Sequence, residues 1–160
     1  AGVSMGPLVA DRRLDIMESF VSNAVSEGAE LLVGGERVQS SGSFYQPTLL
    51  ANVPDSAQIM TEEPFGPIAP TATFASLDEV IDRANSLPFG LAAYAFTGSP
   101  KTAGVLKTEI ESGMLAINSL HIHSVETPFG GLKNSGYGYE GGIEGLEAFL
   151  ATKYSSEVYT

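Results

Sequence analysis

The stretch Ile68–Asn118 is IAPTATFASLDEVIDRANSLPFGLAAYAFTGSPKTAGVLKTEIESGMLAIN, and it decides the fold because short apolar runs alternate in it with helical segments. Three of these runs have the length and composition of strands: Ile68–Phe74, Leu91–Thr97 and Met114–Asn118. Strands that alternate with helices are typical of a sheet covered by the helices that connect its strands. The stretch therefore predicts an α/β fold with an open, mixed or mostly parallel sheet flanked by helices.

Both helices of this stretch begin at recognisable signals. Ser76–Glu79 is a capping box, in which the serine and glutamate side chains accept hydrogen bonds from free backbone N–H groups. The helix that follows should end near Ser86, because a proline comes shortly after it. Ser99 and Pro100 supply an N-cap and a proline in the first turn of the next helix, which we expect to reach about Ser112.

Further elements are expected on both sides of this stretch. Apolar residues recur every three or four positions over 9–27, which predicts an amphipathic helix, and ELLVGG after it is typical of a short strand. The apolar stripe of that helix consists of Leu14, Met17, Phe20, Val21, Ala24 and Val25. Beyond Asn118 lies a long glycine-rich loop, followed by a short helix over Ile143–Leu150 and a β-like run over Thr152–Thr160.

Composition excludes several classes of function. The chain has 8 Lys and Arg against 19 Asp and Glu, a net charge of −11, so it lacks the basic surface that nucleic acids or anionic membranes require. It has no cysteine, which excludes disulfides, thiolate metal sites and thiol catalysis by this chain. No apolar run is long enough to span a bilayer, and the first residues lack the pattern of a signal peptide. We expect an intracellular, cytoplasmic protein.

The segment MTEEPFGP, residues 60–67, is the first candidate for a binding site. Of two adjacent carboxylates on an extended chain only one can face a cleft, and an aromatic ring two residues after Glu63 lies on the same side as Glu63. A carboxylate beside the ring of Phe65 suits a ribose diol next to an aromatic base. The alternative is a surface turn that Pro67 ends.

The second candidate is PFGGLKNSG, residues 128–136. Its glycines allow a close backbone approach, so it could cradle a phosphate or present Phe129 to a pocket. The phosphate hypothesis is the weaker one, because Lys133 is followed by Asn and the P-loop spacing is absent. His121 and His123 precede this motif, but two imidazoles without further ligands do not predict a metal site.

Seven segments occur in an order that resembles the C-terminal third of the NAD(P)-dependent aldehyde dehydrogenases. They are GPL at residues 6–8, EGAELLVGG, QPTLL, EEPFGP, RANSLPFGLAAYAFT, SGMLAIN and PFGGLKNSGYG. The resemblance implies that residues 1–150 are the C-terminal part of a catalytic domain and that residues 151–160 are an oligomerisation strand. That strand, about Thr152–Tyr159, would extend a sheet in a neighbouring subunit of a homo-oligomer.

The same resemblance assigns roles to individual residues. It implies that Glu63 hydrogen-bonds the nicotinamide ribose of NAD or NADP, that Phe65 packs by the nicotinamide ring and that Phe129 lines the channel for an aldehyde substrate. Residues 119–127 resemble the loop at the mouth of that channel. Its segment His123–Glu126 looks like the corresponding loop of succinate-semialdehyde dehydrogenases, where a serine helps to hold the distal carboxylate of the substrate. The resemblance implies that Ser124 or His123 would do so here.

What the family needs for catalysis is not in this chain. The resemblance implies that the cysteine nucleophile, the general base and the dinucleotide-binding region lie before Ala1, so we expect the chain alone to be inactive. Tyr139 also stands before Glu140 where the family usually has Arg, which removes a possible salt bridge. Two alternatives stay open: a freestanding non-catalytic module for assembly or regulation, and a related semialdehyde or acyl-phosphate reductase of the same fold.

Overall fold

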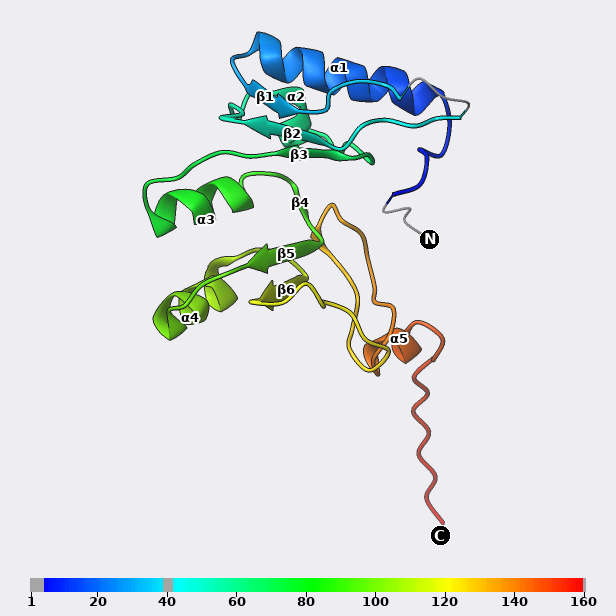
Figure 1. Ribbon diagram of the computed structural model, residues 1–160. Coiled ribbons are helices and arrows are strands. Elements are labelled where there is room, and N and C mark those ends of the chain that lie inside the picture. Colours follow the sequence, from blue (N-terminus) through cyan, green and yellow to red (C-terminus); the bar gives the residue numbers. More distant parts are fainter. Residues whose placement is uncertain (1–4, 39–41, 160) are drawn as a thin grey trace. The chain divides into compact units, whose positions relative to one another are not determined.

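The computed structural model describes residues 5–38 and 42–159, and the chain forms two compact units, residues 1–74 and 75–160 (Figure 1). Each unit has helices and strands of its own. The expected division into residues 1–150 and an oligomerisation strand at residues 151–160 concerns a larger assembly, so it stays a prediction. Thr160 lies outside the described residues.

In the first unit, one long helix packs on a three-stranded sheet (Figure 1). The helix is α1 (Arg12–Ser26), and the sheet has the order β1 (Glu30–Val33), β2 (Thr48–Ala51) and β3 (Ile68–Pro70). β1 is antiparallel to β2, whereas β2 is parallel to β3. A single-turn helix, α2 (Gln58–Thr61), precedes β3. The sheet is therefore mixed.

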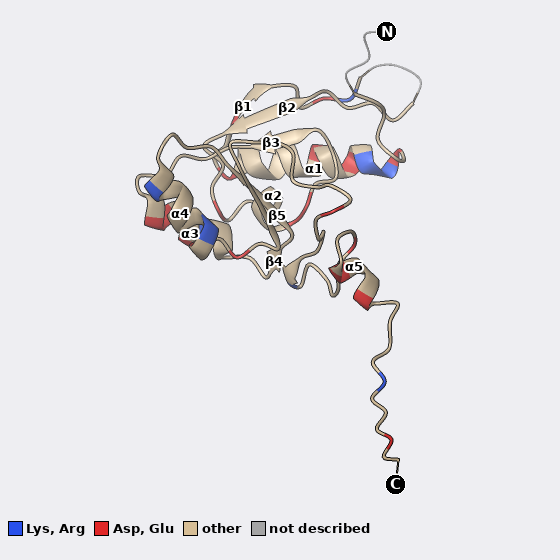
Figure 2. Cartoon of the chain, turned by 90° about the horizontal axis from the view of Figure 1, so that it is seen from below, with Lys and Arg blue, Asp and Glu red and all other residues tan. Residues whose placement is uncertain are grey.

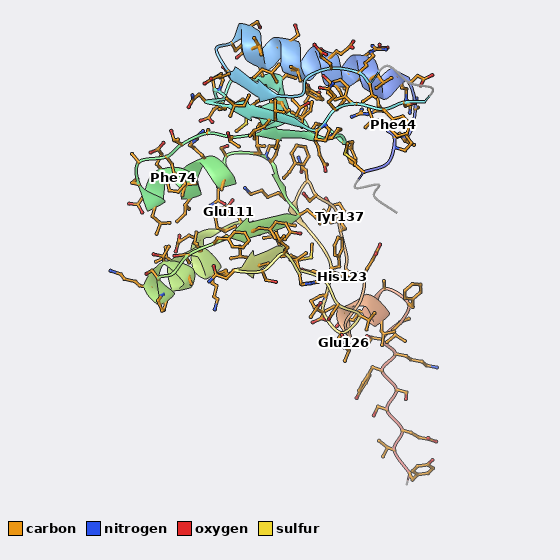
Figure 3. The ribbon with its side chains drawn as sticks, in the orientation of Figure 1. Phe44, Phe74, Glu111, His123, Glu126 and Tyr137 are labelled. Carbon is orange, nitrogen blue, oxygen red and sulfur yellow. The ribbon has the colours of Figure 1, made fainter. Side chains whose placement is uncertain are left out.

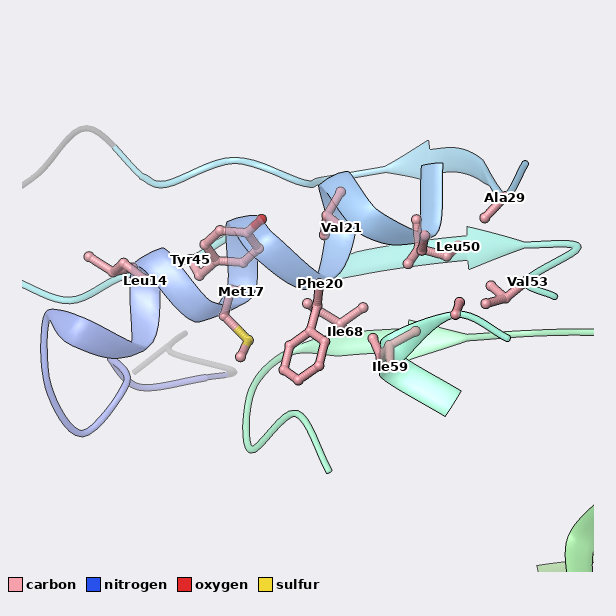
Figure 4. Packing of buried hydrophobic residues seen from close by; sticks show 12 residues of the cluster. Leu14, Met17, Phe20, Val21, Ala29, Tyr45, Leu50, Val53, Ile59 and Ile68 are labelled. Atoms are coloured by element: carbon pink, nitrogen blue, oxygen red, sulfur yellow. The ribbon is translucent and has the colours of Figure 1, made fainter. Parts of the chain in front are cut away.

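The core of this unit lies between α1 and the sheet (Figure 4). Met17 and Ala24 are fully buried, and Leu14, Phe20 and Val21 are nearly so. These residues recur every three or four positions, so one face of the helix is covered, and the predicted stripe is confirmed. Two details were wrong. Val25 is 44% exposed, and α1 begins at Arg12 rather than near Val9, which is 90% exposed.

Two other expectations for this unit need correction. β3 ends at Pro70 instead of extending to Phe74. Thr71 still donates both its N–H and its hydroxyl to the carbonyl of Leu50, but residues 71–74 form no strand. The helix α2 was not predicted, since a single turn of four residues has no periodic apolar pattern.

The second unit contains the strand–helix–strand unit that decided the fold class. Strands β5 (Ala92–Ala95) and β6 (Met114–Ile117) are parallel and are connected by α4 (Pro100–Glu109). α3 (Leu77–Asn85) precedes them. The side chain of Ser76 accepts a hydrogen bond from the N–H of Glu79 at 3.1 Å, and the Glu79 carboxylate accepts one from Ala75 at 2.8 Å. The predicted capping box is confirmed.

α4 begins at its predicted cap but ends early. Ser99 accepts a hydrogen bond from the N–H of Thr102, as expected for an N-cap. The helix stops at Glu109, three residues before the predicted end. The amide of Asn85 explains this, because it donates to the carbonyl of Glu109 and accepts from the N–H of Glu111. A contact with another helix thus replaces the last helical turn.

The glycine-rich loop adds a strand pair that was not predicted. β4 (Phe89–Gly90) is antiparallel to β7 (Leu132–Lys133), and each strand has only two residues. α5 (Glu144–Glu147) follows and is shorter than the helix expected over 143–150. The α/β class with mixed sheets is confirmed, but the described strands form three small sheets instead of one. β4 takes its partner from the glycine-rich loop, so it does not extend the β5–β6 pair.

Residues 148–159 form no strand, and residues 151–159 are exposed (Figure 1). Tyr154, Val158 and Tyr159 are more than 80% exposed, which leaves apolar side chains in water. A strand that pairs with another subunit forms its hydrogen bonds only in the assembly. The predicted oligomerisation strand therefore stays a prediction.

A close contact between two backbone segments holds the glycine-rich loop in the second unit. The N–H of Gly113 donates to the carbonyl of Gly90 at 2.9 Å. A Cβ atom at Gly113 would lie 1.9 Å from the carbonyl oxygen of Gly130 and 2.9 Å from Cα of Gly131. No side chain fits there, so this approach requires glycine.

This contact can be tested by comparing two glycine-to-alanine substitutions. We expect Gly113→Ala to lower the free energy of unfolding by about 1–3 kcal/mol, because backbone must move to admit the methyl group. Gly104 lies inside α4, and a Cβ atom added there would meet nothing within 4 Å. Gly104→Ala should raise stability by about 0.5–1 kcal/mol, as alanine favours helix. Urea unfolding measures both, and equal stabilities would contradict the steric account.

Candidate functional site

The segment EEPFGP forms a turn between α2 and β3. Its start is held by a hydrogen bond from the N–H of Glu62 to the carbonyl of Gln58, and its end by one from Thr48 to the carbonyl of Pro67. Between these points Phe65 is 71% exposed and has a φ of +45°. A positive φ is unusual for a bulky residue and marks local strain. Strain of this kind is concentrated at functional sites.

This turn rests on α1. The guanidinium of Arg13 donates to the carbonyl of Pro64, and the side chain of Met17 fills the space beside Gly66. A Cβ at Gly66 would lie 2.2 Å from the sulfur of Met17. We expected an extended segment that places Glu63 and Phe65 on one side, and the left-handed conformation of Phe65 shows that this premise was wrong. The two residues still share one short, fixed turn.

The two carboxylates of the turn differ in their partners. Glu62 accepts a hydrogen bond from the side chain of Gln58 at 3.1 Å. Glu63 is exposed, and within residues 5–38 and 42–159 its carboxylate has no hydrogen bond or ion pair. Of the two, Glu63 is therefore the carboxylate without a partner among the described residues, and its predicted role in binding a cofactor stays a prediction.

The loop after β6 contains the other predicted residues, of which Figure 3 labels His123. Phe129 and Glu140 exchange backbone hydrogen bonds of 2.7 and 2.8 Å, which fixes the base of the loop. The ring of His123 meets the ring of Phe129 edge to face, with centroids 5.4 Å apart and an interplanar angle of 89°. Such aromatic pairs are favourable. The structure thus brings two predicted substrate-binding residues, His123 and Phe129, into contact.

Ser124 belongs to a tight turn instead of pointing freely from the loop. Its N–H donates to the hydroxyl of Thr127 at 3.0 Å, and the N–H of Thr127 donates back to its carbonyl at 3.2 Å. A hydrogen bond from Ser124 holds the pKa of the Glu126 carboxyl below its usual range. Glu126 is therefore ionised at neutral pH beside the serine that we expected to bind a carboxylate.

Lys133 is fully engaged within its own unit. Its ammonium donates to the carbonyls of Asn85 and Leu87 at 2.8 and 3.1 Å and forms an ion pair with Glu111 at 2.6 Å. It therefore caps the end of α3 from the glycine-rich loop. Lys133 is the cation that a phosphate-binding loop would need, and these contacts already engage it, which argues against the phosphate hypothesis. No local pattern in the sequence indicates this contact, because Asn85 and Lys133 are 48 residues apart.

The predicted residues lie in two groups, Glu63 and Phe65 in the first unit and His123, Ser124 and Phe129 in the second. A surface cavity of about 400 Å³ in the first unit contains none of them. Its lining consists of Glu18, Gly35, Glu36, Arg37, Val38 and Gln46. Arg37 is paired with Asp15 and Glu18, and its hydrogen bond lowers the pKa of Glu18. The lining of this cavity therefore indicates no catalytic or binding site.

Other classes of site are not indicated by the part of the chain that the structure describes. It contains no group of three or more His, Cys, Asp or Glu side chains that could hold a metal ion. Among the described helices, none combines the length and the apolar content needed to cross a membrane. Acidic residues, coloured red along the backbone in Figure 2, occur in both units.

Known proteins resemble the chain over nearly all its length. It is 45% identical to a 4-(hydroxymethyl)benzenesulfonate dehydrogenase of Comamonas testosteroni, over 96% of the chain and 32% of that protein. It is 40% identical to the mitochondrial succinate-semialdehyde dehydrogenase of Rattus norvegicus, over 96% of the chain and 29% of that protein. The chain therefore spans about a third of the length of the curated relatives it matches.

Solved structures agree with these relatives. An aldehyde dehydrogenase from Brucella melitensis biovar abortus matches with a TM-score of 0.94 at 38% identity, over 99% of this chain and 32% of that one. Betaine aldehyde dehydrogenase from Staphylococcus aureus, solved in complex with NAD+, matches with a TM-score of 0.89 at 35% identity, over 96% and 31%. The family model described as the aldehyde dehydrogenase family matches residues 1–155. The chain therefore belongs to the aldehyde dehydrogenase family.

Proposed function

We propose that this chain is the C-terminal part of an NAD(P)-dependent aldehyde dehydrogenase, which oxidises an aldehyde to a carboxylic acid. The observation that carries the proposal is the turn with Glu63 and Phe65. The turn presents the carboxylate of Glu63, which has no hydrogen-bond partner among the described residues, and the exposed ring of Phe65. The helix α1 holds this turn in place. The resemblance to a betaine aldehyde dehydrogenase solved with NAD+ supports the same cofactor class.

The residues of the turn fit a nicotinamide nucleotide. The free carboxylate of Glu63 can accept hydrogen bonds from ribose hydroxyls, which are donors. The exposed ring of Phe65 offers a flat apolar surface to the nicotinamide. The bound cofactor would supply the acceptor for the hydride of the aldehyde, while Glu63 and Phe65 orient it. Whether it is NAD or NADP is decided outside this chain, since these residues contact only the nicotinamide half.

The chain has no cysteine, so it cannot provide the thiolate that attacks an aldehyde carbonyl. We propose that the nucleophile, the general base and the dinucleotide-binding region belong to the part of the relatives that this chain does not cover. The chain then contributes one wall of the nicotinamide site and the loop of the substrate channel. By itself it should be inactive.

On the substrate side, we propose that Phe129 lines the channel and that His123 supports its ring. Succinate semialdehyde is one candidate substrate, with Ser124 or His123 at its distal carboxylate, and a relative of that name supports it. The ionised Glu126 beside Ser124 opposes it, because like charges repel. The Comamonas relative is named for a sulfonate, so sulfonates are a second class of anionic substrate to compare with succinate semialdehyde.

We also propose that residues 152–159 pair with a sheet of a neighbouring subunit, so that the enzyme is a homo-oligomer. The exposed tail, with its aromatic and apolar side chains, supports this proposal. Unpaired apolar segments of this kind bind other chains.

The role of Glu63 can be measured in the complete enzyme with two matched substitutions. We expect Glu63→Gln to raise the KM for NAD(P)+ by about 10-fold or more, because a hydrogen bond to a charged group contributes about 1.5–3 kcal/mol. Glu62→Gln is the control, since that carboxylate already bonds Gln58. It should change this KM less than twofold. Equal effects of the two substitutions would contradict the assignment.

The substrate class can be measured by comparing succinate semialdehyde with butanal. Glu126→Gln should raise the ratio of the two kcat/KM values in favour of succinate semialdehyde by about fivefold. This corresponds to about 1 kcal/mol, the repulsion of two unit charges some 4 Å apart in water. Ser124→Ala should lower the same ratio if the hydroxyl binds the distal carboxylate. A wild-type enzyme that prefers butanal would exclude the succinate hypothesis.

A further inference from the structure

The turn with Glu63 and Phe65 is contacted by Arg13, a residue far from it in the sequence. Its guanidinium, on the first turn of α1, donates to the carbonyl of Pro64, 51 residues away. The side chain is partly buried, and its Nε atom is buried without a hydrogen-bond partner among the described residues. A cationic side chain is rarely placed so for stability alone, because burying it is unfavourable.

Arg12, the residue beside Arg13, is an ordinary exposed arginine at the same end of the helix. Figure 2 colours the start of α1 blue where basic residues lie. The two arginines share one helix turn and carry the same charge, but of the two it is Arg13 that bonds the turn. Arg12 therefore offers a matched control for Arg13.

The carbonyl that Arg13 binds sets the backbone of the next residue. It belongs to the peptide group that joins Pro64 to Phe65, and the orientation of that group determines the φ angle of Phe65. This angle is +45°, in the region that bulky residues avoid. A flip of the peptide group would relieve the strain, but it would also turn the carbonyl away from Arg13. The hydrogen bond therefore opposes the relaxation of Phe65.

The remaining contacts of the turn do not control this peptide group. Glu62 and Pro67 are bonded at the two ends of the turn, to Gln58 and Thr48. Met17 packs against Gly66 but offers no hydrogen bond. Proline has no N–H, so the carbonyl is the hydrogen-bonding group of Pro64. In the described residues its partner is Arg13.

We propose that Arg13 is a positioning residue for the nicotinamide site: it holds the Pro64–Phe65 peptide so that Glu63 and Phe65 keep the arrangement that binds the cofactor. This inference rests on the proposed function of the turn. On this account Arg13 acts on the cofactor only through the turn, by its hydrogen bond to the carbonyl of Pro64.

The test compares Arg13→Met, Arg13→Lys and Arg12→Met, first in the 160-residue chain. Backbone chemical shifts of Phe65 and Gly66, measured by NMR, report φ. Arg13→Met should move them away from the values of a left-handed residue, while Arg12→Met leaves them unchanged. Arg13→Lys should lie between, since a single ammonium donor can still reach a carbonyl. Unchanged shifts in Arg13→Met would overturn the proposal, and if that variant fails to fold, Arg13→Lys carries the comparison.

The same variants in the complete enzyme separate the positioning role from the site itself. We expect Arg13→Met to raise the KM for NAD(P)+ about 10-fold, with partial rescue by lysine and a kcat that changes less than threefold. If Glu63→Gln raises this KM and Arg13→Met does not, the positioning role is wrong and the nicotinamide site stands. If Arg13→Met moves the shifts of Phe65 but neither variant affects the KM, the nicotinamide site itself is wrong.

Discussion

The second unit depends on a backbone contact that only glycine allows. Gly113 approaches the carbonyl of Gly130 so closely that a methyl group does not fit. This contact, the short β4–β7 pair and the ammonium of Lys133 tie the glycine-rich loop to the segment before β5. Among the described residues of this unit only four apolar side chains are buried, Ile81, Leu106, Met114 and Ala116. Backbone hydrogen bonds, more than a packed core, therefore hold the loop that carries Phe129.

The first unit is organised in the opposite way. Among its described residues, twelve buried hydrophobic side chains form one cluster, and α1 also holds the turn with Glu63 and Phe65 through Arg13 and Met17. A packed core can support local strain, such as the positive φ of Phe65. In the second unit, by contrast, no comparable core covers the side chains of Phe89, Tyr94 and Phe96, which are exposed. Large apolar side chains left in water agree with the proposal that this chain packs with the remaining two thirds of an enzyme.

Local signals in the sequence predicted the elements well, whereas contacts between distant segments stayed hidden. The capping residues Ser76 and Ser99 and the apolar stripe of α1 have patterns that depend on neighbouring residues, and each is confirmed. The β4–β7 pair, the early end of α4 and the bond from Arg13 to Pro64 depend on residues far apart in the chain. For the site, the motifs pointed to Glu63, Phe65 and Phe129, whose roles stay predictions. They could not show that Phe65 is strained or that Glu126 stands beside Ser124.

The turn on α1 is proposed to form one wall of a nicotinamide site, and the other roles of the chain follow from this one. A crystal structure of the complete protein with NAD(P)+ bound tests it most directly. We expect the Glu63 carboxylate to accept hydrogen bonds from the nicotinamide ribose, the ring of Phe65 to lie against the nicotinamide and Arg13 still to bind the carbonyl of Pro64. A nicotinamide half bound away from this turn, with Glu63 in solvent, would contradict the proposal.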